Sequence, residues 1–520
     1  MNGSELTKIR QNQMKFAFSQ MNPNLIHGIT NFERISIIEG GMPVIINGRI
    51  VSEVLLNLQE QSSSVSQPSL YSLILQTLDS FFVYNSTSNF GPTVSARRYY
   101  LFFFTIASAY SFITEESRIT GVKDQWDWSV KYPLTSESEI YSWMSSVIYY
   151  ISSSFGFTAS PATWPADERW TVWTSMWTTW WNGRNNDGSV AAATIPNNSL
   201  LPNGAITLTV TQQQDISTYP QPTKWTPLVV EGRKRNYLTY GWGDVRSTCL
   251  SAFDESTIKT SALTKVLSLS EREAEITNLV SIVSSLTDEQ KIIAEFWAGG
   301  PFTITPPGMC IWFWRQFMEY KPQSLSTLFY SGLDLSIQVF ECSRITWELK
   351  KNQMEARPIQ EIRRLFSNTS IPKFDGTADI GANWIPYQML NFVTPPFPDF
   401  PSGHSTFSQA FANVMTDWFG SLIPETEKRT VSNLNLLSPI LPAEVTEAFG
   451  IFEIPVGSSE IQPGIVPTNS IKLSFYNWQQ MAESAGVSRQ YGGIHALSAH
   501  EGGQTVANGV FSKVKESWGI

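Results

Sequence analysis

The sequence predicts a mostly α-helical protein. In "ADERWTVWTSMWTTWW", five tryptophans recur at the spacing of one helix face: Trp170, Trp173, Trp177, Trp180 and Trp181. "TDEQ", at Thr287–Gln290, has the form of a capping box and opens the apolar run "KIIAEFWA". A long helical pattern then runs from Leu325 to Lys350. Helices are therefore expected in both halves of the chain.

The composition indicates a compact protein with a large core. Of 520 residues, 42% are hydrophobic and 13% aromatic, while only 16% are charged. A disordered chain would be poorer in hydrophobic residues and richer in charge. The net charge of −9, without a long basic cluster, argues against nucleic acid or an anionic membrane as a partner.

Three further absences restrict the class of protein. Cys249, Cys310 and Cys342 are widely spaced and form no CxxC motif, so neither a zinc site nor a disulfide framework is indicated. The N-terminus lacks the apolar core of a signal peptide. The longest apolar run, residues 99–113, is too short to span a bilayer. We expect a soluble protein, cytoplasmic by default.

The chain divides into three parts by its sequence character. Residues 1–181 are expected to be helical, and residues 182–254 form a turn-rich, irregular excursion in which "AITLTVTQ" alternates like a short strand. Residues 255–520 return to helical patterns, with helices expected after Ser402, around 442–449 and over 473–488. The tryptophan stripe is interpreted as buried helix packing. A subunit interface is the alternative, and it leaves the oligomeric state open.

The stretch "FPSGHST" lies where one of these helices should begin. A proline-rich run precedes it and helical spacing follows, which places Ser402, Gly403 and His404 in the first turn. The N–H groups of a helix N-terminus favour an anion, and His404 would stand beside it as a proton donor or acceptor. Taken alone, a serine-capped helix with a surface histidine is the simpler interpretation.

Two other stretches strengthen the anion hypothesis. "LKKNQMEARPIQEIRR" carries Lys350 at a helix end and Arg357 before a proline, where the chain should turn. "VSRQYGGIHALSAHEGG" carries Arg489, and its Gly-Gly break can direct His495 away from the helix. Arginine offers a planar fork for oxyanion oxygens. Each stretch alone could be a solvated polar surface, but together the three predict an oxyanion site.

The complete series K-x6-RP, PSGH and SR-x3-G-x-H resembles the superfamily shared by vanadium-dependent haloperoxidases and the phosphatidic-acid-phosphatase-type acid phosphatases. "GPTVSARRYYLFFFTIASAYSF", "AEFWAGGPFTITPPG" and "NFVTPPFPDFPSGHSTF" look like the haloperoxidase branch, and the resemblance covers about residues 90–515. The length of the chain and the lack of spans agree with that branch. The resemblance implies two helical bundles in one body, with the site in the second.

The resemblance also implies a cofactor, vanadate, and a role for each site residue. His495 would bind vanadium, and His404 would be the acid–base catalyst, with Lys350 also polarising bound peroxide. The oxygens of vanadate would be bound by Lys350, Arg357, Ser402, Gly403 and Arg489. The expected reaction is oxidation of halide by hydrogen peroxide to hypohalous acid, which halogenates organic acceptors. The alternatives are a soluble acid phosphatase with His495 as nucleophile, and a non-enzymatic oxyanion binder.

The chain departs from the family pattern at several positions. Family members often carry an aspartate, thought to anchor the vanadate-binding arginine, where this chain has Gly299, and Met309 and Cys310 replace a His-Trp pair. Glu295 or another carboxylate could anchor Arg489 instead. Phe397 occupies a position where chloride-oxidising members also have phenylalanine. It is either a dry wall that favours harder oxidations or simple packing; bromide and iodide are expected substrates, and chloride stays open.

Overall fold

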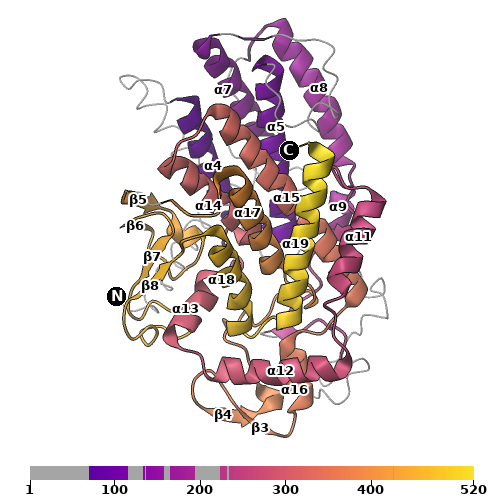
Figure 1. Ribbon diagram of the computed structural model, residues 1–520, viewed down its shortest axis with the longest axis vertical. Helices are drawn as coiled ribbons and strands as arrows, with labels where there is room; N and C mark the ends of the chain where they lie inside the picture. The colour runs from indigo at the N-terminus through magenta and orange to yellow at the C-terminus, as the bar shows by residue number, and fades with distance from the viewer. Residues whose placement is uncertain are drawn as a thin grey trace, which may run out of the picture.

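The structure is a computed structural model that describes residues 69–114, 133–134, 136–156, 164–193, 223–230, 233–424 and 427–519. It is mostly helical, as predicted, with two helical bundles joined in one body (Figure 1). The first bundle contains α4 (Leu70–Thr87), α5 (Pro92–Thr114), α7 (Glu137–Ser154), α8 (Glu168–Asn185) and the short α9 (Ser189–Ala192).

The second bundle follows a short 3-10 turn, η5 (Trp242–Asp244), and holds the remaining helices: α11 (Ala252–Leu263), α12 (Leu269–Ser284), α13 (Asp288–Phe296), α14 (Thr305–Tyr320), α15 (Leu325–Gln353), α16 (Pro358–Leu365), α17 (Gly403–Phe419), α18 (Trp478–Tyr491) and α19 (Leu497–Trp518). None of the helices that the structure describes is both long and apolar enough to cross a membrane.

The long helix α15 joins the two bundles. It packs against α5 of the first bundle and against α14, α17 and α19 of the second, and Figure 1 shows it in the middle of the molecule. Almost every residue from Ser326 to Lys350 is buried, as expected for a helix that neighbours surround on all sides. Gly332 allows the close approach of α5, because a Cβ there would overlap the ring of Phe103.

The tryptophan stripe on α8 is core packing, as predicted. Four of its tryptophans are buried, whereas Trp181 is half-buried. Trp173 meets Trp143 of α7 edge to face at 5.5 Å, and Trp177 meets Tyr150 in the same way at 5.0 Å. The capping box at Thr287 is also present and begins α13.

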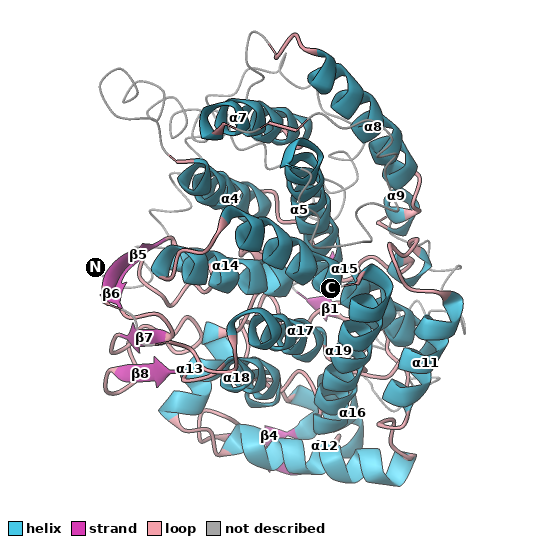
Figure 2. Ribbon diagram, turned by 45° about the horizontal axis from the view of Figure 1, so that its top comes forward, coloured by secondary structure: helices cyan, strands magenta, loops and turns pink. Residues whose placement is uncertain are grey.

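Within the described residues, the strands form four separate antiparallel pairs (Figure 2). The pairs are β1 (Val229–Val230) with β2 (Arg233–Lys234), β3 (Ser370–Pro372) with β4 (Ala378–Ile380), β5 (Arg429–Ser432) with β6 (Glu444–Glu447), and β7 (Ile451–Ile454) with β8 (Ile471–Ser474). Two 3-10 turns, η6 (Gly381–Asn383) and η7 (Leu434–Leu436), lie between them. The predicted strand "AITLTVTQ" and residues 1–68 lie outside the described residues.

Two helix predictions were wrong in detail. Residues 444–447, expected in a helix, form β6, because Val445 and Thr446 favour extended backbone and pair with Val431 and Thr430 of β5. The helix expected from Leu473 begins only at Trp478, since Leu473 lies in β8 and Asn477 caps the helix.

Candidate oxyanion site

The three sequence motifs meet in the second bundle. Lys350 lies in the last turn of α15, and Arg357 is the N-cap of α16, after a left-handed residue, Met354, that ends α15. Arg489 lies in the last turn of α18. His495 follows in the loop to α19, after Gly493, whose φ of 67° lets the chain reverse.

The PSGH stretch begins α17 as predicted. Ser402 is the N-cap, and its Oγ accepts a hydrogen bond from the Ser405 N–H at 3.4 Å. Gly403 is the first helical residue, and a Cβ there would make only ordinary contacts, with Phe407 at 3.6 Å and Trp347 at 3.7 Å. Side-chain packing therefore does not require this glycine, and its N–H lies in the first turn of the helix, where anions are favoured.

The three cations of these motifs are buried and are held chiefly by backbone carbonyl oxygens. Lys350 Nζ donates to Pro398 O (2.8 Å) and Asp399 O (2.9 Å). Arg357 donates to the carbonyls of Phe397 (2.6 Å) and Ile494 (2.8 Å), and its Nη1 lies 3.1 Å from His495 Nε2.

Glu295 does not anchor Arg489, contrary to the expectation from the sequence. Its Nη2 and Nη1 donate to Ala294 O (2.7 Å) and Ala298 O (3.4 Å), at the C-terminal end of α13. Glu295 points elsewhere and accepts from Tyr387 Oη and Ser459 Oγ, each at 2.5 Å. The negative end of the α13 dipole thus takes the place of a carboxylate.

The electrostatics of this cluster favour a bound anion. Burial, followed by Arg357, lowers the pKa of Lys350 well below its ordinary value, and the same two causes lower the pKa of Arg489 to about 9. Burial also lowers the pKa of Arg357 to about 10. The Nη2 of Arg357 is buried and has no hydrogen-bond partner among the described residues. An oxyanion bound beside these three cations could accept the hydrogen bond that Arg357 Nη2 lacks. The residues present therefore fit vanadate or phosphate.

A residue that the sequence analysis missed, Asp399, completes the cluster. Its Oδ1 lies 2.5 Å from His495 Nδ1, and its Oδ2 accepts from Arg272 Nη2 of α12 at 2.7 Å. Burial alone would raise the pKa of Asp399, but His495 and Arg272 lower it well below its usual range. The signal available in the sequence was a single charged residue within the apolar run "PPFPDFP", two residues before PSGH.

His404 and His495 are both held neutral. Burial, and then Arg489, lowers the pKa of His404 well below its ordinary value. Burial, and then Arg357, lowers the pKa of His495 to about 3, although Asp399 opposes this shift. His404 Nε2 lies 2.8 Å from Trp297 O, and because a carbonyl only accepts, Nε2 carries the proton and Nδ1 the lone pair.

The glycine at position 299 suits its place beside His404. Its φ is 55°, in the left-handed region, and a Cβ would lie 3.1 Å from Pro306 Cδ and 3.3 Å from His404 Nε2. Any side chain here would crowd both neighbours. The aspartate that family members often carry would therefore not fit this backbone without a shift of His404.

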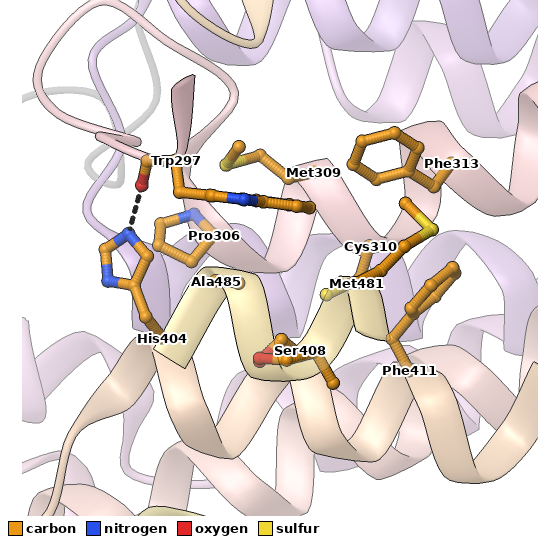
Figure 3. Close-up of a pocket in the computed structure, with 11 residues that line it drawn as sticks. Trp297, Pro306, Met309, Cys310, Phe313, His404, Ser408, Phe411, Met481 and Ala485 are labelled. Carbon is orange, nitrogen blue, oxygen red and sulfur yellow. Dashed lines mark hydrogen bonds between the residues drawn. The ribbon is translucent and has the colours of Figure 1, made fainter. Parts of the chain in front are cut away.

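A small apolar pocket adjoins His404 on the same side (Figure 3). Met309 and Cys310, the two other departures from the family pattern, both line it, together with Trp297, Phe313 and Phe411. Figure 3 shows His404 at one end, with its ring directed at the Trp297 carbonyl. The three departures from the family pattern thus gather around His404.

Phe397 forms a wall beneath two of the cations. Its ring centroid lies 4.9 Å from Arg357 Cζ and 5.1 Å from Lys350 Nζ, and it packs against Trp347 at 5.0 Å. Cations are attracted to an aromatic face, so the ring both steadies these side chains and excludes water. The packing and the dry-wall interpretations are therefore both compatible with its position.

Comparison with known proteins identifies the second helical bundle and the fold. Residues 333–518, a little more than a third of the chain, match the family model of the VCPO second helical-bundle domain. These residues contain every predicted site residue. A comparison with the sequences of curated proteins gave no match.

Solved structures match a larger part of the chain. An apo-type bacterial vanadium-dependent chloroperoxidase has a TM-score of 0.55 and 14% identity, covering 82% of this chain and 95% of its own. A bacterial vanadium-dependent iodoperoxidase has a TM-score of 0.53 and 17% identity, covering 85% and 95%. A holo-type bacterial chloroperoxidase has a TM-score of 0.53 and 14% identity, covering 82% and 93%. The predicted resemblance to the vanadium-dependent haloperoxidase family is thereby confirmed, in the second helical bundle by the family model and in the fold by the solved structures.

Proposed function

We propose that this protein is a vanadate-dependent haloperoxidase. It would oxidise bromide and iodide with hydrogen peroxide to hypohalous acid, which then halogenates organic acceptors. The observation that carries the proposal is the cluster of buried cations around a neutral histidine, with a buried arginine N–H that has no partner among the described residues. Such a cluster supports a bound oxyanion of high charge.

The hydrogen-bond donors and charges of the cluster indicate which residues would hold vanadate. Arg357 offers its unpartnered Nη2, and the N-terminus of α17 offers the backbone of Gly403 beside the Ser402 hydroxyl. Lys350 and Arg489 supply fixed positive charge from two other helices, and His495 offers the lone pair of Nε2 to the metal. Bound vanadate would supply Lewis acidity that activates hydrogen peroxide without a redox change at the metal.

His404 would move the proton in this reaction. Its Nε2–H is committed to Trp297 O, so Nδ1 is the basic atom. The low pKa of His404 keeps that nitrogen unprotonated in the free protein, and it can accept a proton from incoming peroxide. Fixing Nε2 on a backbone carbonyl also keeps the ring in one orientation.

Phe397 would set the surroundings of the halide. Its ring leaves the Lys350 ammonium facing an apolar wall, so a halide beside Lys350 would be poorly hydrated. Weak hydration makes a halide easier to oxidise. The matched structures include a chloroperoxidase and an iodoperoxidase at nearly equal TM-scores, so the fold does not discriminate between halides.

The test is halide oxidation by metal-stripped protein with and without orthovanadate. Bromide and peroxide are supplied, a dimedone-type acceptor reports, and phosphate competes. We expect activity only with vanadate, reduced by phosphate, after which chloride replaces bromide. Steady hydrolysis of p-nitrophenyl phosphate without bromination would instead support the acid phosphatase with His495 as nucleophile. Silence in both assays would leave an oxyanion-binding protein.

A further inference from the structure

We propose that Asp399 is a positioning residue that fixes the tautomer of His495, with the proton on Nδ1 and the lone pair on Nε2. The inference rests on the proposed function, because it concerns the histidine that would bind vanadium. It adds a residue outside the three motifs.

The first evidence is the contact on the Nδ1 side of the ring. Asp399 Oδ1 lies 2.5 Å from His495 Nδ1, and both side chains are buried, with 0% and 3% of their surfaces exposed. An ionised carboxylate can only accept hydrogen bonds. Nδ1 must therefore carry a proton for this contact to be favourable.

The second observation concerns Arg357, which lies close to both ring nitrogens. Its Nη1 is 3.1 Å from His495 Nε2 and 3.4 Å from Nδ1, and a guanidinium group can only donate. With Nδ1 protonated beside Asp399, Nε2 is the ring nitrogen that can accept from Arg357. The guanidinium contact is thus compatible with the tautomer that the carboxylate requires.

This arrangement leaves the lone pair of Nε2 toward the anion-binding cations. When an oxyanion is bound, Arg357 can donate to its oxygens, and the Nε2 lone pair becomes free for the central atom. A carboxylate beside Nδ1–H also makes Nε2 a stronger donor of its electron pair, as at metal-bound histidines generally.

Asp399 is itself held from several directions. Its Oδ2 accepts from Arg272 Nη2 at 2.7 Å and from the Ala496 N–H at 3.4 Å. Its backbone N–H donates to Glu355 O at 3.0 Å, and its carbonyl accepts from Lys350 Nζ at 2.9 Å. The residue that orients His495 therefore also places one of the cations.

Arg272 in turn keeps the Asp399 carboxylate from turning away. It is buried on α12 and also contacts Glu361 (2.9 Å), Glu355 (3.1 Å) and Glu275 (3.2 Å). Several carboxylates thus share this one guanidinium, but among them only Asp399 pairs with His495. Glu361 therefore provides a matched control, since it touches Arg272 without touching the histidine.

The position of the buried carboxylate differs from the family pattern. That pattern has an aspartate for the arginine of the third motif, where this chain has Gly299 and uses backbone carbonyls instead. In this chain a buried carboxylate lies beside Nδ1 of the histidine that would bind the metal.

The experiment compares wild type with Asp399→Asn and Glu361→Gln. The full chain is labelled with ¹⁵N-histidine, whose four residues give few signals, and His495 is assigned with a His495→Gln variant. The metal-free wild type should show the Nδ1–H tautomer at His495. In Asp399→Asn the amide should turn its oxygen to Arg272 and its NH2 to the ring, which favours Nε2–H.

The second readout is orthovanadate affinity, measured by calorimetric titration. Asp399→Asn should weaken binding by about 10- to 100-fold, the usual effect of removing the partner of a metal-binding histidine. Glu361→Gln should keep both the tautomer and the affinity of wild type. Inorganic phosphate, titrated in the same way, tests the oxyanion site without a metal.

The outcomes separate this inference from the proposed function. An Nε2–H tautomer in wild type, or unchanged vanadate affinity in Asp399→Asn, would overturn the role of Asp399 while leaving the enzyme assignment intact. If wild type binds vanadate but oxidises no halide, the proposed function fails, and the vanadate affinity of Asp399→Asn still tests the role of Asp399. If Asp399→Asn does not fold, the tautomer of His495 in wild type is the test of that role.

Discussion

Replacing Gly299 by alanine tests the geometry on the His404 side of the site. The φ of 55° should cost about 1–2 kcal/mol for a residue with a Cβ. The added Cβ would also stand 3.3 Å from His404 Nε2, which is closer than most such contacts, and would disturb the 2.8 Å bond to Trp297 O. A weakened hydrogen bond adds roughly 0.5–1.5 kcal/mol. The total loss of stability should therefore be about 1.5–3.5 kcal/mol.

The neighbouring glycine provides the control. A Cβ at Gly300 meets nothing within 4 Å, and its φ is not positive, so Gly300→Ala should change stability by no more than about 0.5 kcal/mol. The assay is urea denaturation of both variants and wild type, compared through the midpoints with a common slope. Equal midpoints for the two alanine variants would refute the argument, and so would a Gly299→Asp variant as stable as wild type.

Three further predictions concern His404, Arg489 and pH. His404→Ala should keep vanadate binding but lower halide turnover by about 100-fold or more, measured by titration and steady-state kinetics; lost binding would contradict its acid–base role. Arg489→Lys keeps the charge but loses the fork that holds two carbonyls, so calorimetry should show vanadate affinity about 10-fold lower, whereas Arg364→Lys, paired with Glu273, should match wild type. In vanadate-free protein, the free energy of unfolding should fall as pH drops from 6.5 toward 3, because the unfolded chain binds the proton that folded His495 refuses. His495 contributes up to about 1.4 kcal/mol per pH unit, and this contribution should be absent in His495→Gln, which keeps only the similar contribution of His404.

The features that the sequence predicted correctly depend on local chemistry. The helix ends at Thr287 and Ser402 follow from capping, which involves residues only three apart. The tryptophan face of α8 follows from helical periodicity. By contrast, β6 depends on a partner strand, and a short run of alternating glutamate, valine and threonine does not reveal that partner.

The missed parts of the site depend on contacts between distant segments. Asp399 and Arg272 are separated by 127 positions, and no spacing rule connects them. Arg489 is held by the carbonyls of Ala294 and Ala298, and backbone atoms leave no signature in residue types. The search for a replacement carboxylate at Glu295 therefore failed because the replacement was not a side chain.

The most direct test of the oxyanion site is a titration of orthovanadate into metal-stripped wild type and into His495→Ala, measured by isothermal calorimetry. The account predicts one vanadate bound per chain in wild type, displaced by phosphate, and loss of tight binding in His495→Ala. Absence of vanadate and phosphate binding in wild type, or equally tight vanadate binding in both proteins, would contradict the site built from Lys350, Arg357, Arg489 and His495.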